Sequence, residues 1–461
     1  MRYLSQKKKS TSSLLDKLRC DFSLSSLYSD ERIFLCCFNC RGILMKYKLL
    51  TLCLSTALLT PIAPVLASTD SKTDMVLDQV LVLSRHNLRT PIVNTGILTE
   101  VTDKKWPAWD AQSGYLTTKG GALEVYMGHY FREWIDQNKL LADELCPTSN
   151  EDVYLYTNSL QRTIATAQFF AAGAFPGCKV SIHHQPEIGK MDPVFNPIIT
   201  NASPEFKQQA LAEMEQYFKG LSLTAGYDEL DSVLNIKDSQ KCKTDKLCNL
   251  NNQKNSFIIE AEKEPGVSGP LKIANSAVDA IDLQYYEGFP ANEVAWGLVN
   301  TPEKWKKLNT LKNAYQETLF TPKIIAKNVA HPILNYIDKG FVSVDKGETA
   351  KFIFLVGHDS NIASLMSAMD FKPYQLPEQY EHTPIGGKLV FQRWTDKQAN
   401  KDFMKVEYVY QTADQLRDNT YLSLQTPPKH VTLELKGCPI DKSGYCSWED
   451  FQKVMATALE Q

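Results

Sequence analysis

Three short segments of the sequence carry side chains suited to the chemistry of phosphate esters. They are R-H-N-L-R-T-P at 85–91, S-L-Q-R-T at 159–163 and G-H-D-S-N at 357–361. Guanidinium groups bind phosphoryl oxygens, an imidazole can attack phosphorus, and a carboxyl group can protonate a leaving alcohol. The combination predicts a phosphate-ester site built from six side chains: Arg85, His86, Arg89, Arg162, His358 and Asp359.

His86 is the predicted nucleophile of this site. Arg85 and Arg89 flank it, and their positive charge favours a neutral imidazole and draws negative charge from a transferring phosphoryl group. Asp359 is the predicted proton donor to the leaving oxygen, and His358 can donate to a phosphate oxygen. A single histidine or arginine in such a segment is more often structural, so the prediction depends on the three segments occurring together.

Each segment follows a short apolar run that is typical of a buried strand. These runs are 79–84, 153–157 and 352–356, and the second and third lead into helical patterns. Ligand sites of open α/β sheets form at the carboxyl ends of the strands, so three junctions of this kind predict one site. Arg162 is expected in the first turn of a helix capped by Asn158, where backbone N–H groups favour anions.

The chain has 461 residues, which is enough for two or three domain-sized units. We expect the regions 68–190 and 341–461 to form one α/β domain, because the strand patterns lie there. The region 191–340 between them has mostly helical patterns and is expected to be an inserted α-helical domain. Two antiparallel strands and a C-terminal helix over 447–459 are expected after Gly386.

The first 67 residues have the composition of a leader. Residues 1–67 carry 10 Lys and Arg against 4 Asp and Glu, whereas the whole chain has a net charge of −3. A basic start at Met45, an apolar stretch and the sequence V-L-A before Ser68 predict a cleaved signal peptide over 45–67. Residues 1–44 are expected to be a spurious extension that arises from a start codon assigned too early.

Export and an acidic body limit the partners of the protein. Pro61 and Pro64 interrupt the apolar stretch of the leader, which favours cleavage over a membrane anchor. Residues 68–461 hold 40 Lys and Arg against 49 Asp and Glu, and such an acidic chain is a poor nucleic-acid binder. We therefore expect no nucleic acid and no membrane partner after cleavage, and the protein as a monomer or a homodimer.

Cysteine usage agrees with export. Six cysteines follow residue 67, and their even number and local spacings are typical of disulfides formed in an oxidising compartment. Six cysteines allow 15 connectivities, and sequence alone does not distinguish between them. No pair among them has the C-x2-C spacing of a zinc site, so we expect no metal and no cofactor. We favour the sequential pairs Cys146–Cys178, Cys242–Cys248 and Cys438–Cys446.

The motif R-H-x-x-R-x-P at 85–91, together with His358 and Asp359, resembles the paired signature of the histidine acid phosphatases. The similarity extends over 68–461 and includes P-I-G-G-K at 384–388. It implies an α/β fold, in which a phosphoglycerate-mutase-like (histidine phosphatase) α/β sandwich domain carries an inserted, mostly α-helical domain. It also implies an enzyme of the periplasm.

The resemblance implies a role for each site residue. His86 would form a phosphohistidine intermediate, Asp359 would donate the proton, and Glu264 would contact the sugar side of the substrate. Most members carry Gly after the motif histidine, whereas this chain has Asn87, which is expected to add volume and an amide at the pocket mouth. The phosphate would be bound by Arg85, Arg89, Arg162 and His358.

A small phosphate ester, such as glucose 1-phosphate, is the substrate that the resemblance implies. A phytase acting on inositol hexakisphosphate or a broad-specificity acid phosphatase is the alternative, because the same machinery serves these esters. A phosphotransferase of the phosphoglycerate mutase type shares the R-H signature, but cytosolic metabolism does not fit an exported chain with cystines. A periplasmic sugar-phosphate binding protein would explain the arginines, yet it has no need of a histidine next to an aspartate.

Overall fold

The computed structural model describes residues 75–92, 96–142, 145–147 and 152–460. All of them belong to one compact unit, Asp70–Gln461. The expected extension at 1–44 and the expected signal peptide at 45–67 lie outside the described residues. None of the helices in the described ranges is long and apolar enough to cross a membrane.

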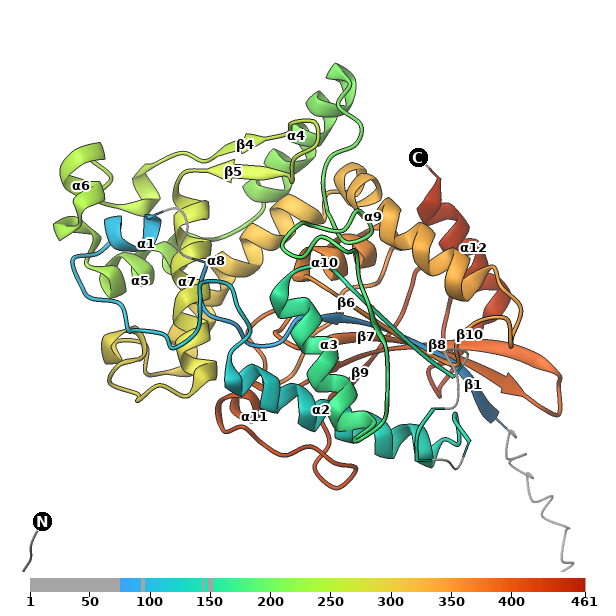
Figure 1. Cartoon of the computed structure of the whole chain (residues 1–461). Helices are drawn as coiled ribbons and strands as arrows, with labels where there is room; N and C mark the ends of the chain where they lie inside the picture. Colours follow the sequence, from blue (N-terminus) through green and yellow to red (C-terminus); the bar gives the residue numbers. More distant parts are fainter. Residues whose placement is uncertain (1–74, 93–95, 143–144, 148–151, 461) are drawn as a thin grey trace, which may run out of the picture. The chain divides into compact units, whose positions relative to one another are not determined.

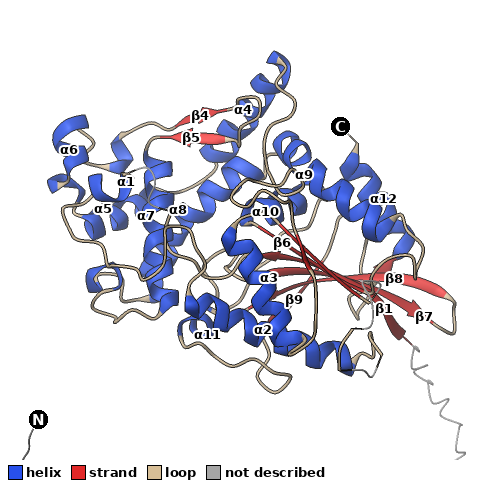
Figure 2. Ribbon diagram, viewed as in Figure 1, coloured by secondary structure: helices blue, strands red, loops and turns tan. Residues whose placement is uncertain are grey.

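A mixed sheet, which has eight strands within the described residues, forms the centre of the fold (Figure 2). Its order is β10-β8-β7-β1-β6-β2-β3, and β9 pairs with β8. Strands β1, β6 and β2 are parallel neighbours, so their carboxyl ends lie at one edge of the sheet. The strands are β1 (Met75–Arg85), β2 (Val153–Thr157), β3 (Ile182–His183), β6 (Phe352–Gly357), β7 (Lys388–Asp396), β8 (Lys401–Tyr410), β9 (Lys429–Leu433) and β10 (Cys446–Ser447).

Helices cover both faces of this sheet, because alternate side chains of its central strands point to opposite faces. On β1, Val80 and Val82 belong to one apolar core, whereas Leu81 and Leu83 belong to another. Figure 1 shows the resulting three-layer α/β sandwich. One face carries α2 (Thr118–Gln137) and α3 (Gln161–Ala174), and the other carries α9 (Lys323–Ile337), α10 (Asp359–Ala368) and α12 (Trp448–Leu459).

A further group of helices packs around an apolar core of its own. Helix α9 contributes to two cores, since Ile325 and Val329 pack with this group while Ala330 and Ile333 pack toward the sheet. The helical region and the sandwich therefore share one helix, and the expected domain limits at 190 and 340 stay a prediction. The group consists of α4 (Pro204–Lys219), α5 (Thr224–Leu234), α6 (Gln240–Asp245), α7 (Pro270–Glu287) and α8 (Pro302–Phe320).

Most of the expected elements are present, with two differences. β1 begins at Met75 and not at residue 79, because antiparallel pairing with β7 extends it. A hairpin of β4 (Ser256–Ile258) and β5 (Gly266–Ser268) lies in the helical region, where the sequence has no strong strand signal. Smaller helices are α1 (Ile97–Glu100), α11 (Ala413–Arg417) and the short helical turns at 236–238, 250–252, 294–297 and 338–342.

The C-terminal part follows the expected pattern. Strands β7 and β8 pair antiparallel along their whole length, and α12 ends the chain with Ser447 as its cap. The six cysteines of the described ranges form three disulfides between neighbours in the sequence, which are the pairs that the spacing favours. These are Cys146–Cys178, Cys242–Cys248 and Cys438–Cys446.

Candidate active site

The carboxyl ends of β1, β6 and β2 bring the predicted side chains together. Arg85 ends β1 and His86 follows it, while Asp359 begins α10 directly after β6. Arg162 is the second residue of α3, in the first helical turn as expected. The ring centroids of His86 and His358 lie 5.5 Å apart, and Arg85 Nη2 lies 3.1 Å from Asp359 Oδ2.

His86 is buried and has one ring nitrogen occupied by the backbone. Its Nδ1 lies 2.9 Å from the carbonyl oxygen of Asn87. A carbonyl oxygen can only accept, so Nδ1 carries the proton and Nε2 carries the lone pair. Burial lowers the pKa of His86 well below its usual value, and the positive charges of Arg162 and Arg89 lower it further. The result is a neutral imidazole with a free Nε2.

His358 has the opposite tautomer, because Asn158 donates to it. The Oδ1 of Asn158 accepts from the backbone N–H groups of Ser159 and Asp192, each at 2.8 Å, which fixes the orientation of the amide. Its Nδ2 then donates to Nε2 of His358 at 2.6 Å. Burial, Arg162 and Arg85 lower the pKa of His358 well below its usual value. The neutral ring therefore keeps its proton on Nδ1.

Asn158 is a site residue that the sequence did not indicate in this role. The sequence predicts it as the cap of the helix that carries Arg162, and this prediction is wrong. The cap position of α3 is Leu160, and no side chain caps the helix there. The amide is instead used to orient His358, over a separation of 200 residues.

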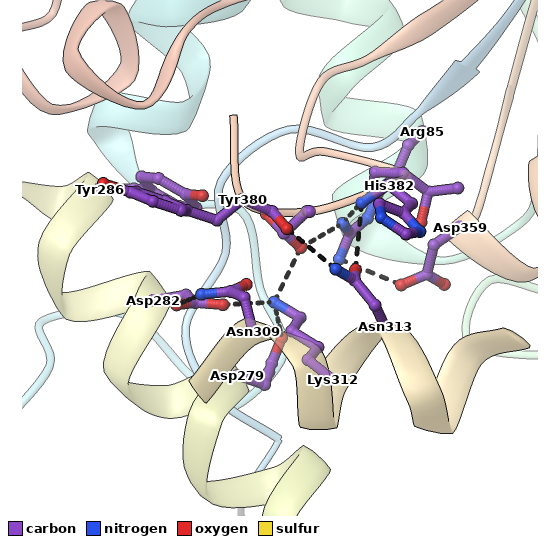
Figure 3. Close-up of polar contacts among 12 residues, drawn as sticks. Arg85, Asp279, Asp282, Tyr286, Asn309, Lys312, Asn313, Asp359, Tyr380 and His382 are labelled. Carbon is purple, nitrogen blue, oxygen red and sulfur yellow. Dashed lines mark hydrogen bonds and ion pairs between the residues drawn. The ribbon is translucent and has the colours of Figure 1, made fainter. Parts of the chain in front are cut away.

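Two of the three arginines are held by carboxylates. Arg85 Nη1 lies 2.9 Å from Glu381 Oε1 and Nη2 lies 3.1 Å from Asp359 Oδ2, so its fork joins both groups. Burial opposes the charge of Arg85, but these carboxylates outweigh it and raise the pKa. Arg89 Nη1 lies 3.1 Å from Asp279 Oδ2. Figure 3 shows Asp359 beside Arg85, and Asp279 on α7.

Arg162 is the exception, since it forms no ion pair with another side chain of the described ranges. Its Nε has no hydrogen-bond partner there either. Burial and the nearby Arg89 lower the pKa of Arg162 to about 10. Asp359 and Asp279 act on it only from a distance. A largely buried cation without an ion pair is costly, and an anion bound next to it would remove that cost. Arg162 is therefore the side chain of the site that most favours an anionic ligand.

A buried ionic cluster supports the arginines from the helical region. Lys312 of α8 has its Nζ 2.8 Å from Glu381 Oε1, 3.1 Å from Asp282 Oδ2 and 3.2 Å from Asp279 Oδ1. Asn309 donates to Asp282 at 3.0 Å. Figure 3 shows Lys312 reaching toward Asp279 and Asp282 of α7. Two members of this cluster hold Arg85 and Arg89, so the helical region sets the positions of phosphate-binding candidates.

A cavity of about 280 Å³ lies between Arg89 and helices α7 and α8. Arg89, Asp359 and Glu264 lie in its wall, which gives it charges of both signs. Glu264 is exposed to solvent there. The surrounding protein and the carboxylate of Asp359 raise the pKa of Glu264, while Arg162 opposes the shift. The structure therefore puts Glu264 in one cavity with two of the predicted site residues.

The described ranges hold no cluster of three or more His, Cys, Asp and Glu side chains able to bind a metal ion. The charges next to His86 are guanidinium groups, which can stabilise a phosphoryl group by themselves. A buried neutral imidazole with three arginines and a carboxyl group, of which Arg89 and Asp359 line the cavity, is a set that can transfer a phosphoryl group.

Comparison with known families agrees with this geometry. Residues 76–411 match the model of the histidine phosphatase superfamily (branch 2). The chain belongs to this superfamily.

Named relatives of this histidine phosphatase come from enteric bacteria. It is 91% identical over 417 residues to a glucose-1-phosphatase of Providencia rettgeri, with 90% of this chain and 100% of the relative covered. It is 54% identical over 385 residues to a glucose-1-phosphatase of Salmonella typhimurium, with 83% of this chain and 93% of the relative covered. Its fold matches a solved structure of the phytase from Citrobacter braakii with a TM-score of 0.75 and 31% identity, over 83% of this chain and 97% of that chain.

Asn87 does not lie where the sequence predicts it in this histidine phosphatase. Its side chain is fully buried. Its Nδ2 donates to Glu124 Oε2 at 2.6 Å, so the amide points between α2 and β7. The expectation of a residue at the pocket mouth is therefore wrong, because the partner that the amide finds is a buried carboxylate.

Proposed function

We propose that this histidine phosphatase is a glucose-1-phosphatase that works through a phosphohistidine on His86. The observation that carries the proposal is the neutral, buried imidazole whose Nδ1 proton is held by a backbone carbonyl beside three arginines. Such a nitrogen is a nucleophile that needs no deprotonation. The two glucose-1-phosphatases at 91% and 54% identity support the choice of substrate.

The reaction runs in two displacements at phosphorus. In the first, Nε2 of His86 forms a bond to phosphorus while the bond from phosphorus to the sugar oxygen breaks, and Asp359 gives that oxygen its proton. Arg85, Arg89 and Arg162 balance the charge on the phosphoryl oxygens. In the second displacement, a water molecule gives a proton to Asp359 and its oxygen attacks phosphorus, which frees His86 and releases phosphate.

Substrate binding competes with an ion pair of the resting enzyme. Arg85 holds Asp359 at 3.1 Å, and a phosphate dianion offers the same guanidinium a stronger partner. Once Arg85 binds the phosphoryl oxygens, Asp359 loses its counter-charge. It can then take up a proton from solvent or from a substrate monoanion and give that proton to the leaving oxygen. His358 supplies its Nδ1 proton to another phosphoryl oxygen.

Glu264 supports a small substrate with one phosphate. The cavity of about 280 Å³ suits one sugar ring, and a carboxylate in its wall can accept hydrogen bonds from hydroxyl groups. The same carboxylate repels further phosphates, as on inositol hexakisphosphate. Phytase is the second candidate, because solved phytases share the fold at 31% identity.

The nucleophile is tested by trapping. We expect acid-quenched enzyme to carry phosphate on histidine after mixing with labelled p-nitrophenyl phosphate. His86→Ala should trap none, whereas His129→Ala, on the outer side of α2 and bonded to Tyr421, should trap as much as the parent. Equal trapping by His86→Ala and the parent would refute the proposal.

The substrate is tested by comparing kcat/KM for glucose 1-phosphate and inositol hexakisphosphate. We expect the parent to have the higher kcat/KM for glucose 1-phosphate. Glu264→Gln should bring the kcat/KM values for the two substrates closer together. A parent that prefers the inositol ester would make the protein a phytase, and an unchanged ratio in the variant would remove Glu264 from substrate selection.

The periplasm is the proposed location of the mature enzyme. Three disulfides within the described residues support an oxidising compartment. We expect N-terminal sequencing of exported protein to begin at Ser68. A mature chain that keeps residues 45–67 would contradict the proposed signal peptide.

A further inference from the structure

A fully buried ion pair connects α2, β7 and the segment that carries His86. Lys388 Nζ lies 2.8 Å from Glu124 Oε1, and neither side chain is exposed. A buried pair of this kind seldom stabilises a fold more than well-packed apolar side chains would. The proposed reaction uses neither group, so the pair has no role in the steps above.

The ammonium of Lys388 has all three of its protons engaged. Besides Glu124, it donates to Ser84 Oγ at 2.9 Å and to the carbonyl oxygen of Gly386 at 3.0 Å. These acceptors belong to the end of β1 and to the turn before β7. The geometry therefore holds Oε1 of Glu124 in place and leaves Oε2 for one further donor.

That donor is Asn87, the residue after the nucleophile. Its Nδ2 donates to Glu124 Oε2 at 2.6 Å, and its Oδ1 accepts from the backbone N–H of Leu88 at 2.8 Å. Its own backbone N–H donates to Thr166 Oγ1 at 3.0 Å. Asn87 is thus held at its backbone nitrogen and at both ends of its amide, which also fixes its carbonyl oxygen.

The carbonyl oxygen of Asn87 is the acceptor of the Nδ1 proton of His86, at 2.9 Å. The neighbouring turn is shaped around the same amide, since a Cβ on Gly386 would lie 2.8 Å from Nδ2 of Asn87. Gly386 also has a φ of 65°, which glycine adopts without strain. Its backbone N–H donates to the carbonyl oxygen of His86 at 3.2 Å.

We propose that Asn87 is a positioning residue, which the Glu124–Lys388 pair holds so that its carbonyl keeps the proton of His86 on Nδ1 and leaves Nε2 free. This inference rests on the proposed role of His86. It assigns a use to the buried pair and to the turn at 384–388. In this role Asn87 does not select the substrate, and its loss lowers kcat for every phosphate ester.

Two variants separate positioning from packing. Asn87→Ala removes the bond to Glu124 and should lower kcat about tenfold, the smaller end of the range for supporting residues. Asn87→Asp keeps the size but sets a second carboxyl group against Glu124. We expect its kcat to be low at pH 8 and to recover toward the parent at pH 5, because a proton shared by the two groups restores a donor.

The assays use the full mature enzyme with glucose 1-phosphate and p-nitrophenyl phosphate, and inorganic phosphate as inhibitor. Nitrogen-15 NMR of histidine-labelled enzyme reports the tautomer of His86, with its signal assigned by its loss in His86→Ala. Tyr130→Phe is the matched control, since it removes another hydrogen bond of α2, the partly buried one to His430 at 2.7 Å.

Positioning predicts equal losses of kcat for both esters, an unchanged inhibition constant for phosphate, and a His86 tautomer that becomes mixed in Asn87→Ala. Parent-like kcat with an unchanged tautomer would overturn the inference, as would a changed ratio between the two esters or an Asn87→Asp variant without recovery in acid. If the parent hydrolyses neither ester, the proposed function fails, and the NMR comparison still decides the role of Asn87.

Discussion

Lys312→Met tests whether the buried cluster beneath the arginines depends on charge. The substitution keeps most of the side-chain volume and removes an ammonium that contacts three carboxylates within 3.2 Å. Asp279 and Glu381 would still have Arg89 and Arg85, but Asp282 would keep only the amide of Asn309. Breaking a buried pair in this way costs about 3–5 kcal/mol of the free energy of unfolding.

The loss in the free energy of unfolding should depend on pH, and the protonation of Asp282 decides in which direction it changes. Burial already raises the pKa of this carboxyl group above its usual value, and removal of Lys312 raises it further. A carboxyl group with a raised folded-state pKa binds its proton more tightly in the folded than in the unfolded chain, so acid stabilises the variant relative to the parent. The difference in free energy of unfolding between the parent and Lys312→Met should shrink by about 1.4 kcal/mol for each pH unit over which Asp282 is charged in the parent and neutral in the variant.

Urea unfolding at pH 8 and pH 5, followed by tryptophan fluorescence with the disulfides intact, measures this. We expect Lys312→Met to lose much of its free energy of unfolding at pH 8 and less of it at pH 5. Lys190→Met is the control, because Lys190 pairs with Glu187 on the surface, where both side chains are more than 70% exposed. Equal losses at the two pH values would show that packing alone explains the effect, and a loss below about 1 kcal/mol at pH 8 would refute the charge argument.

Three shorter predictions concern the reaction. Asp359→Asn should slow phosphoenzyme formation far more for glucose 1-phosphate than for p-nitrophenyl phosphate in rapid-quench experiments, since only the alcohol needs a proton to leave; equal slowing would remove Asp359 as the acid. Activity should survive dialysis against EDTA, because arginines provide the charge stabilisation, and restoration only by an added divalent cation would contradict this. The lowered pKa of His86 keeps its imidazole neutral in mild acid. The plot of kcat/KM for p-nitrophenyl phosphate against pH should therefore show no fall on the acid side with a midpoint near 6.5, the usual histidine value. A fall with that midpoint would mean that His86 titrates normally.

The core of the site could be predicted from the sequence because its signals are local. Each of three apolar runs ends where a functional segment begins, and parallel pairing of β1, β6 and β2 places those ends together. The roles proposed for His86 and Asp359 follow from their residue types and from that meeting point. The start of β1 could not be predicted as well, because its first residues are held by pairing with β7, more than 300 residues away.

The groups that hold the arginines could not be found in this way. Glu381 lies 296 residues from Arg85, and Asp279 lies 190 residues from Arg89. Neither follows a strand or belongs to a motif, and on a helical pattern Asp279 and Lys312 look like ordinary surface charges. Only the packing of α7 and α8 against the segments that carry Arg85 and Arg89 makes them buried partners.

Lys388 shows where a closer reading of the sequence had a usable signal. It stands between two glycines and the apolar run L-V-F, at the start of a strand whose first six residues are all buried. A charged residue in such a strand is rarely buried unless it is paired, so the position itself demands a buried carboxylate. The same reasoning applies to Asn87, whose amide stands at the end of a buried strand and must find partners there. Two polar side chains buried together, next to the proposed nucleophile, are then a reason to look for a shared acceptor such as Glu124 before either of them is assigned to the substrate.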